Sequence, residues 1–252
     1  MKIAGITRVR NEEAIIKDTL DHFSQFCNAG IYVYDDVSTD KTVDICQAHS
    51  AVKDVILGRY WNPNRFDAEW QTRQAALVRA QQDNPDWLIY FDADERIEFD
   101  FNLLDDPDLK GVDAIWMKLF DFYITPEDAH LPYTARKWMG CEYRRIIMAF
   151  KNSPHLRYHI PDQRIVTLPP GAQTIVAGYV KHYGKAISIE EWEATCDYYA
   201  NNFPEPYRSK WLARKGKAIH IDKSDFNLPL IQWQEKDIKG VELNPSIERN
   251  AI

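Results

Sequence analysis

The sequence has no apolar run that could cross a membrane. A membrane-spanning helix needs about 18 consecutive apolar residues, and no run in this chain approaches that length. The N-terminus turns polar at Thr7 and Arg8, which is too early for a secretory signal peptide. We therefore expect no transmembrane segment and a cytoplasmic protein, and we leave open whether it attaches peripherally to a membrane.

Positive charge and paired cysteines are also scarce. The 31 Lys and Arg residues are outnumbered by 38 Asp and Glu residues, which gives a formal charge of −7. A nucleic-acid partner would need a concentrated basic face, so none is expected. The four cysteines lie far apart without a Cys-x-x-Cys pair, which is typical of reduced thiols in a cytosolic protein.

What the first hundred residues do contain is an alternation of strand and helix patterns. Short apolar segments predict strands at 2–7, 30–34, 52–57 and 87–91. Helical spacing predicts helices over 12–26, 41–49 and 68–82, the second of them capped by the run Ser38-Thr39-Asp40. This alternation favours an α/β fold, with a doubly wound, mostly parallel sheet and helices on both faces.

The pattern changes after residue 100. Further strands are expected at 114–120, 144–150, 165–168 and 175–180, and a helix at 190–202. The last forty residues have no clear period. We interpret residues 1–252 as a single domain with two functional halves, 1–110 and 111–225, followed by a C-terminal tail at 226–252.

Two of the predicted strands end in carboxylates. The strand at 87–91 leads into Asp92-Ala93-Asp94-Glu95, and the strand at 30–34 leads into Asp35-Asp36. An Asp-x-Asp pair places two carboxylates on one side of the chain, where they suit a hard divalent cation that also binds phosphate oxygens. The alternative is a pair of solvated acidic loops. Because ligands bind at the carboxyl ends of parallel strands, the coincidence of two such clusters favours a binding site.

These motifs resemble those of a known family. The run Asp35-Asp36-Val37-Ser38-Thr39-Asp40-Lys41-Thr42 is similar to the Asp-Asp-Gly-Ser-Thr-Asp-Gly-Thr motif of family 2 glycosyltransferases, nucleotide-sugar enzymes with the GT-A fold. Arg10-Asn11-Glu12-Glu13 resembles their opening Asn-Glu, and Phe91-Asp92-Ala93-Asp94-Glu95 resembles their Asp-x-Asp metal site. Arg73 stands where these enzymes often carry an arginine. The resemblance covers roughly residues 1–100, and Val37 departs from the usual glycine.

The resemblance implies a GT-A-like fold and transfer of a sugar from a nucleotide donor, expected to be a UDP-sugar, to a saccharide or glycolipid hydroxyl. It further implies inversion, dependence on Mn²⁺ or Mg²⁺, and a role in polysaccharide or glycan biosynthesis. Asp36 or Asp35 would bind the base, Asp94 the metal and Asp92 the donor ribose or sugar. The implied nucleotide-sugar-binding residues are Thr7, Arg10, Glu12, Asp35, Asp36, Arg73, Asp92 and Ala93. The implied metal ligands are Asp94, Asp92 and His182.

The second half resembles the bacterial, lipopolysaccharide-modifying branch of the family more loosely. Three short motifs carry this likeness: Arg144-Arg145-Ile146, His159-Ile160-Pro161-Asp162 and His182-Tyr183-Gly184. His182 would complete the metal site, and the alternative is a hydrogen-bonded loop histidine. The catalytic base should come from this half, because the carboxylates committed to the metal lie on the wrong side of the donor sugar. Asp162 and Glu142 are the candidates, each with the alternative of a solvated loop acid.

Two other classes of protein are compatible with parts of the pattern. Haloacid-dehalogenase-like phosphohydrolases also carry Asp-x-Asp after an apolar strand. Their motif lies on the first strand of the domain and continues with Thr or Val, whereas Glu95-Arg96 follow here. A non-catalytic saccharide-binding module would use the abundant aromatic residues but would leave the acidic strand ends unexplained.

Overall fold

The computed structural model describes residues 1–62, 65–106, 109–159, 164–238 and 240–243. The chain divides into two compact units. Unit 1 consists of residues 1–62, 67–117 and 146–178, and unit 2 consists of residues 63–66, 118–145 and 179–252. Both units are therefore built from separate stretches of the chain. The functional halves expected at 1–110 and 111–225 stay a prediction.

Unit 1 contains the predicted strand–helix alternation. Its first elements are β1 (Ile3–Val9), α1 (Ile16–Ser24), β2 (Ile31–Asp35), α2 (Thr42–Ala48), β3 (Val52–Leu57), α3 (Arg65–Gln81) and β4 (Trp87–Phe91). The four strands are parallel and lie in the order β3-β2-β1-β4. In this register Ile6 of β1 lies between Tyr32 of β2 and Tyr90 of β4, so the carboxyl ends of these strands share one edge.

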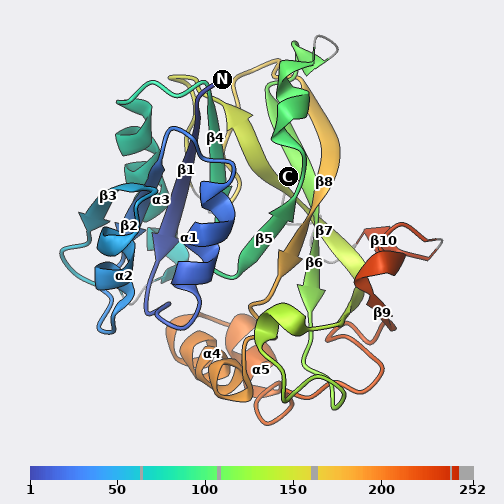
Figure 1. The fold of residues 1–252 in the computed structure, drawn as a ribbon. Coiled ribbons are helices and arrows are strands. Elements are labelled where there is room, and N and C mark those ends of the chain that lie inside the picture. The colour runs from blue at the N-terminus through green and yellow to red at the C-terminus, as the bar shows by residue number, and fades with distance from the viewer. Residues whose placement is uncertain (63–64, 107–108, 160–163, 239, 244–252) are drawn as a thin grey trace. The chain divides into compact units, whose positions relative to one another are not determined.

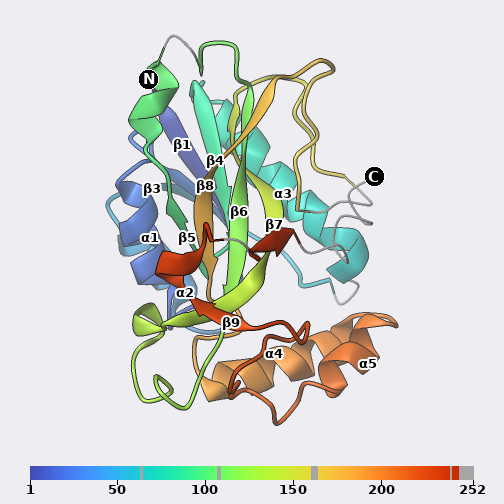
Figure 2. The ribbon, with the colours of Figure 1, turned by 90° about the vertical axis from the view of Figure 1, so that its right-hand side faces the viewer.

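Helices cover both faces of this parallel sheet. Helices α1 and α2 lie on one face, and α3 lies on the other (Figures 1 and 2). On the α1 face the ring of Phe23 stacks on Phe91 of β4, with centroids 3.6 Å apart and planes 7° apart. On the opposite face, Leu77 of α3 belongs to a buried cluster with Ile6 and Leu88. The α/β, doubly wound fold expected from the sequence is confirmed.

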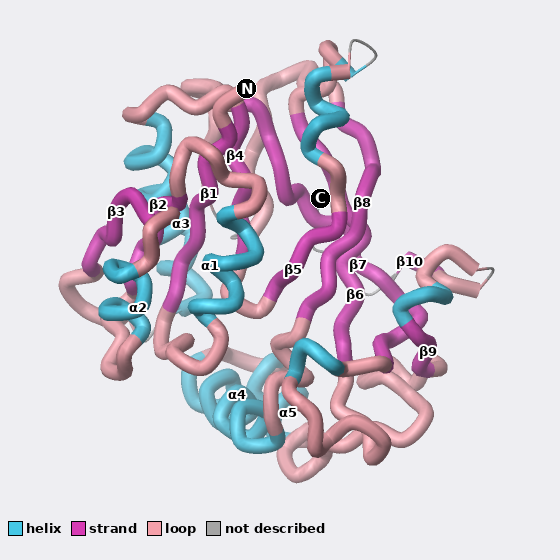
Figure 3. The backbone as a smooth tube through the Cα atoms, viewed as in Figure 1, coloured by secondary structure: helices cyan, strands magenta, loops and turns pink. Residues whose placement is uncertain are grey.

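The remaining strands of the sheet are less regular. They are β5 (Glu95–Glu98), β6 (Ala114–Phe122), β7 (Trp138–Lys151) and β8 (Thr174–His182). The order along the sheet is β3-β2-β1-β4-β7-β6-β8-β5, and β7 runs antiparallel to β4. The sheet is therefore parallel on one side of β4 and mixed on the other. Figure 3 shows β6, β7 and β8 as long strands. Each of them has residues in both units.

Unit 2 adds a pair of helices and short pieces of strand. Its further elements include α4 (Ile189–Asn202), α5 (Tyr207–Leu212), β9 (Leu230–Gln232) and β10 (Glu242–Leu243). It also contains the short 3₁₀ turns η3 (Tyr133–Ala135) and η4 (Trp233–Glu235), whereas the turn η1 (Phe101–Asp105) belongs to unit 1. Helices α4 and α5 share a small core in which Trp211 stacks on Tyr199, 4.6 Å away. β9 and β10 both pair with β7, which extends that strand well beyond the predicted 144–150.

Three local predictions are corrected. The first helix begins at Ile16 rather than Glu12, because the turn before it is tied to the next loop: Glu12 N donates to Thr42 Oγ1 at 2.7 Å. Helix α2 has Lys41 at its N-cap, and Ser38 instead accepts a hydrogen bond from the backbone of Asn11. The expected strand at 165–168 is reduced to an isolated bridge between Thr167 and Arg157.

Among the residues that the structure describes, no helix is both long enough and apolar enough to span a membrane.

Candidate functional site

Two loops of unit 1 are joined at the carboxyl edge of the sheet. After β1, the Arg10 guanidinium donates to the backbone carbonyls of Asp36 (2.6 Å) and Val37 (2.9 Å), and it lies over the Trp61 ring. Val37 has a φ of 61°, a left-handed conformation that is strained for a β-branched residue. Arg10 therefore stabilises the tight turn at the position where the related motif carries glycine. Glu12, predicted to bind the donor, also joins the two loops: its backbone N–H donates to Thr42 Oγ1.

The two neighbouring carboxylates at the end of β2 differ in their partners. Asp36 is buried and accepts a hydrogen bond from Arg8 at 2.6 Å. Its burial raises its pKa, and attraction to Arg8 and Arg10 offsets this only in part. Asp35 Oδ2 accepts from the backbone of Ser38, whereas its buried Oδ1 has no hydrogen-bond partner among the described residues.

Thr7, one position before Arg8 on β1, also carries a buried polar atom without a hydrogen-bond partner among the described residues. Its side chain is fully buried, and no partner for its hydroxyl is found within the described parts of the chain. A buried polar atom without a hydrogen bond costs on the order of 1–3 kcal/mol. The end of this sheet therefore carries unsatisfied polar atoms on two adjacent strands, β1 and β2.

At the end of β4, Asp92 is held by two arginines. Arg164 Nε lies 3.1 Å from its Oδ2, Arg73 lies 3.7 Å from Oδ1, and the Tyr90 hydroxyl donates to Oδ1 at 2.7 Å. Burial disfavours the charged carboxylate, but Arg164 and Arg73 outweigh it and hold the pKa of Asp92 below its usual range. Arg164 also reaches the buried Glu95 at 2.7 Å and lies over the Tyr90 ring. Asp92 is therefore an anchored, ionised group.

The turn after Asp92 carries the other two residues of the acidic motif. The carbonyl of Ala93 accepts hydrogen bonds from the Thr19 hydroxyl of α1 and from Arg96. This fixes the backbone of the turn and the half-buried Asp94 that follows. Within the described residues, no group of three or more His, Cys, Asp or Glu side chains could hold a metal ion. A cation bound here would need oxygen ligands from another molecule.

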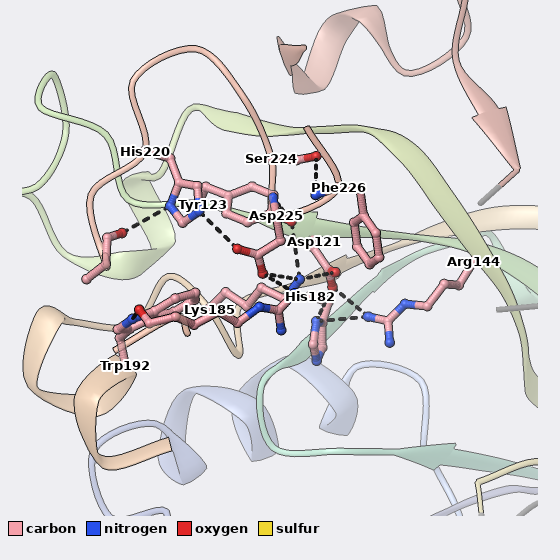
Figure 4. A network of polar contacts seen from close by, with 12 residues as sticks. Asp121, Tyr123, Arg144, His182, Lys185, Trp192, His220, Ser224, Asp225 and Phe226 are labelled. Atoms are coloured by element: carbon pink, nitrogen blue, oxygen red, sulfur yellow. Dashed lines mark hydrogen bonds and ion pairs between the residues drawn. The ribbon is translucent and has the colours of Figure 1, made fainter. Parts of the chain in front are cut away.

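His182, the third predicted metal ligand, belongs to a polar network in unit 2 (Figure 4). Its Nδ1 lies 2.6 Å from Asp121 Oδ1, which Arg144 also contacts at 2.5 Å. Lys185 bridges Asp121 at 2.9 Å and Asp225 at 3.0 Å. Burial opposes ionisation of Asp121, but Arg144, Lys185 and His182 together lower its pKa well below the usual range.

The network continues beyond Lys185. Arg214 pairs with Asp225 at 2.8 Å, and His220 Nε2 lies 3.2 Å from the same carboxylate. Burial disfavours the charged form of Asp225, but His220, Lys185 and Arg214 outweigh it and lower its pKa to about 2. Asp121 and Asp225 are therefore each surrounded by cationic or hydrogen-bonding partners.

Of the two candidate bases, only Glu142 can be placed. It is 5% exposed, in unit 2, and neither carboxylate oxygen has a well-formed hydrogen bond in the described structure. Burial raises its pKa, although the nearby Ser224 hydroxyl lowers it slightly. A Cβ on Gly140 would come within 2.5 Å of its Oε1, so a larger residue there would have to displace this carboxylate. Asp162 lies outside the described residues.

Unit 1 thus brings Thr7, Arg10, Glu12, Asp35, Asp36, Arg73, Asp92, Ala93 and Asp94 together, while Glu142 and His182 lie in unit 2. Sequence reasoning missed Arg164, the residue that anchors Asp92, because the two residues are far apart in the sequence and meet only in the fold. It also missed Asp121, although a carboxylate between Phe120 and Phe122 in an apolar strand was a usable signal. Such a residue is rarely buried unless it is paired.

Curated proteins and solved structures with similarity to this chain were found. An uncharacterized protein of Mycobacterium tuberculosis is 26% identical over 242 residues, which is 90% of this chain and 58% of that protein. The chain thus spans less than two thirds of the length of this relative. Staphylococcus aureus TarS in complex with UDP is 14% identical and has a TM-score of 0.45, covering 85% of this chain and 70% of that chain.

A third similar protein is glucosyl-3-phosphoglycerate synthase from Mycobacterium tuberculosis, in complex with Mn²⁺, UDP and glucosyl-3-phosphoglycerate. It is 23% identical, with a TM-score of 0.33, and covers 48% of this chain and 44% of that chain. The family model described as glycosyl transferase family 2 matches residues 6–158, more than half of the 252-residue chain. This chain belongs to glycosyl transferase family 2.

Proposed function

We propose that this protein transfers a sugar from a nucleotide-sugar donor to a hydroxyl of a saccharide or glycolipid acceptor. The carrying observation is the set of polar groups at the carboxyl ends of β1, β2 and β4, where Asp35 Oδ1 and Thr7 Oγ1 are buried without partners among the described residues. Such atoms favour a bound molecule that completes their hydrogen bonds. Family membership supports glycosyl transfer as the reaction class.

In this proposal Asp35 recognises the nucleobase. Its Oδ1 is an acceptor, so the matching group is an N–H on the base edge, which uracil offers at N3. Asp36 is already bonded to Arg8 and therefore holds the arginine rather than the base. A base that presents an acceptor at this point would leave Asp35 unpaired and would be strongly rejected. A uridine diphosphate sugar meets this requirement and is the proposed donor.

The acidic turn after β4 fits Mn²⁺ or Mg²⁺. Asp92 Oδ1 already accepts from Tyr90 and Oδ2 is paired with Arg164, so Asp94 is the proposed principal ligand, with Asp92 beside it. Such cations retain several non-protein ligands and bind through one or two carboxylates plus substrate phosphates, which fits the small number of acidic side chains that the described residues gather here. When bound, the ion would offset the charge that develops on the departing diphosphate.

The acceptor hydroxyl would lose its proton to a carboxylate of the C-terminal half, and a single displacement would invert the anomeric carbon. Glu142 fits this role because burial raises its pKa and because its oxygens lack well-formed hydrogen bonds in the described structure. A base of raised pKa holds the abstracted proton more strongly. Asp162 is the second candidate, and a comparison of variants decides between them.

The direct test is a screen of nucleoside diphosphates and their sugars for thermal stabilisation, with and without Mn²⁺ or Mg²⁺. A uridine ligand at a hundred times its Kd should raise the Tm by about 5–10 °C, and removal of the metal should reduce that shift. Phosphate release from a generic phosphomonoester would instead support a phosphohydrolase. Saccharide binding without dependence on nucleotide or metal would support a binding module.

A further inference from the structure

One stretch of unit 2 has a charge opposite to that of the whole chain. Residues 206–221 contain five Lys and Arg residues and no Asp or Glu, in a chain of net charge −7. We call this stretch the basic segment; its cations are Arg208, Lys210, Arg214, Lys215 and Lys217. It comprises α5, the turn at 213–216 and the chain that continues to Ile221.

Most of this charge is not neutralised. Arg214 pairs with Asp225 and Lys215 pairs with Asp197. Arg208, Lys210 and Lys217 are exposed, and the described residues offer none of them a carboxylate within ion-pair distance.

Apolar side chains emerge beside these cations. Ile219 forms a parallel bridge to Ile124, so the chain is extended there and alternate residues point to opposite sides. Ala218 and His220 face inward: Ala218 is 5% exposed, and the His220 ring packs on Trp192. Ile219 and Ile221 face outward, and Ile221 is 82% exposed. In most surface strands the large apolar side chains face inward, whereas here two isoleucines face the solvent.

The inner side of the basic segment is firmly held. Trp211 is buried in the core shared with α4, and Trp192 donates a hydrogen bond to the carbonyl of Arg214 at 3.2 Å. Figure 2 shows α4 and α5 lying next to each other. Leu212, which directly follows the buried Trp211 in the sequence, is 51% exposed. The exposed apolar groups are therefore carried on a packed framework.

We propose that the basic segment docks on the surface of an anionic lipid membrane. Basic residues are attracted to anionic headgroups, and apolar side chains at their level insert into the boundary with the acyl chains. The three exposed apolar residues, Leu212, Ile219 and Ile221, supply the inserting groups. A nucleic acid would match the charge but would offer little apolar surface to bury Ile221. Docking here is independent of the donor and the reaction.

The test is co-sedimentation of the purified chain with vesicles of phosphatidylcholine alone or mixed with phosphatidylglycerol. We expect binding to the anionic vesicles only, weakened by salt. The double variant Arg208→Gln/Lys217→Gln should lower partitioning about 25-fold, at roughly fivefold for each cation. Ile221→Ser should lower it about tenfold. The matched controls are Lys2→Gln/Lys110→Gln and Val78→Ser, which alter exposed residues of unit 1.

Several outcomes would overturn the proposal. These are equal binding to neutral vesicles, no binding to anionic ones, and equal losses in the segment variants and the controls. Concentration-dependent dimerisation that Ile221→Ser abolishes, without vesicle binding by the parent, would make this surface a contact between copies of the chain. Thermal denaturation of each variant separates loss of binding from loss of folding.

Discussion

The polar clusters of the two units are built around similar carboxylates but differ in how fully those carboxylates are paired. In unit 2, Asp121 is matched by Arg144, His182 and Lys185. In unit 1, arginines hold Asp92 and Asp36, yet Asp35 Oδ1 keeps an unused, buried acceptor. A fully paired buried cluster holds the fold together without a ligand. One with unused acceptors gains stability when a ligand supplies the missing donors.

The largest effect is expected at the acidic turn of unit 1. Asp94→Asn removes the charge that would hold the cation, so turnover should fall on the order of a thousandfold while the protein stays folded. Turnover and Mn²⁺-dependent UDP binding, measured with Glu98→Gln as a control for an exposed carboxylate of β5, test this. Unchanged metal-dependent binding by Asp94→Asn would remove Asp94 from the metal site.

How well the sequence predicts these regions depends on how local the determining pattern is. β3 and β4 begin and end at the expected residues, because their apolar runs are bounded by polar turns on both sides. The strands β9 and β10 were not predicted, because they are three and two residues long and exist through pairing with β7. Pairing between distant segments leaves almost no trace in local composition.

The same distinction applies to the site. The carboxylates at the ends of β2 and β4 were predicted, because each directly follows an apolar strand. The partner that anchors one of them was not: Arg164 lies 72 positions beyond Asp92 and reaches it only in the fold. Nor could the sequence distinguish Asp35 from Asp36, because their difference is the position of Arg8 relative to each carboxylate.

In unit 2, breaking the pairing should cost stability rather than ligand binding. Lys185→Met leaves Asp121 and Asp225 without their shared cation, so the free energy of unfolding should fall by about 3–5 kcal/mol. The matched control is Lys215→Met, which breaks an exposed pair with Asp197 and should cost less than about 1 kcal/mol. Urea denaturation measures both. Equal, small losses would mean that the buried network contributes little.

Lys185→Met should also change how the free energy of unfolding depends on pH. The folded-state pKa of Asp225 is lowered to about 2, below its unfolded value near 4, so its contribution to stability is present above pH 4 and lost as pH falls toward 2. Lys185→Met raises that folded-state pKa. The acid limb of its stability profile should therefore be shallower than that of the parent between about pH 4 and 2.

Glu142 distinguishes catalysis from stability within unit 2. As the base, Glu142→Gln should lower turnover on the order of a hundredfold, with UDP binding near normal. Because its folded-state pKa is raised, ionisation of Glu142 opposes folding, and this loss grows as pH rises through its unfolded pKa. The neutral Gln variant should thus be at least as stable as the parent at neutral pH. Near-parental turnover in both Glu142→Gln and Asp162→Asn would exclude both as the base.

In unit 1, Asp35 and Asp36 offer a matched pair. Asp35→Ala should weaken UDP binding about tenfold to a hundredfold while binding of pyrophosphate is unchanged, because only the base contact is lost. Asp36→Ala should instead destabilise the fold, since it leaves the guanidinium of Arg8 without its closest carboxylate. Calorimetric titration with both ligands tests the assignment. An equal loss for UDP and pyrophosphate in Asp35→Ala would place Asp35 near the phosphates.

The smallest effect is expected at His182, a predicted metal ligand that lies inside the paired network of unit 2. Its Nδ1 is 2.6 Å from Asp121 Oδ1, so Nδ1 carries the proton and any coordination falls to Nε2. His182→Ala should raise the Mn²⁺ concentration for half-maximal activity about tenfold, and His182→Gln should not restore it. Thermal stability should change little, because Arg144 and Lys185 still neutralise Asp121. Unchanged metal dependence, with a loss of stability instead, would assign His182 to the network alone.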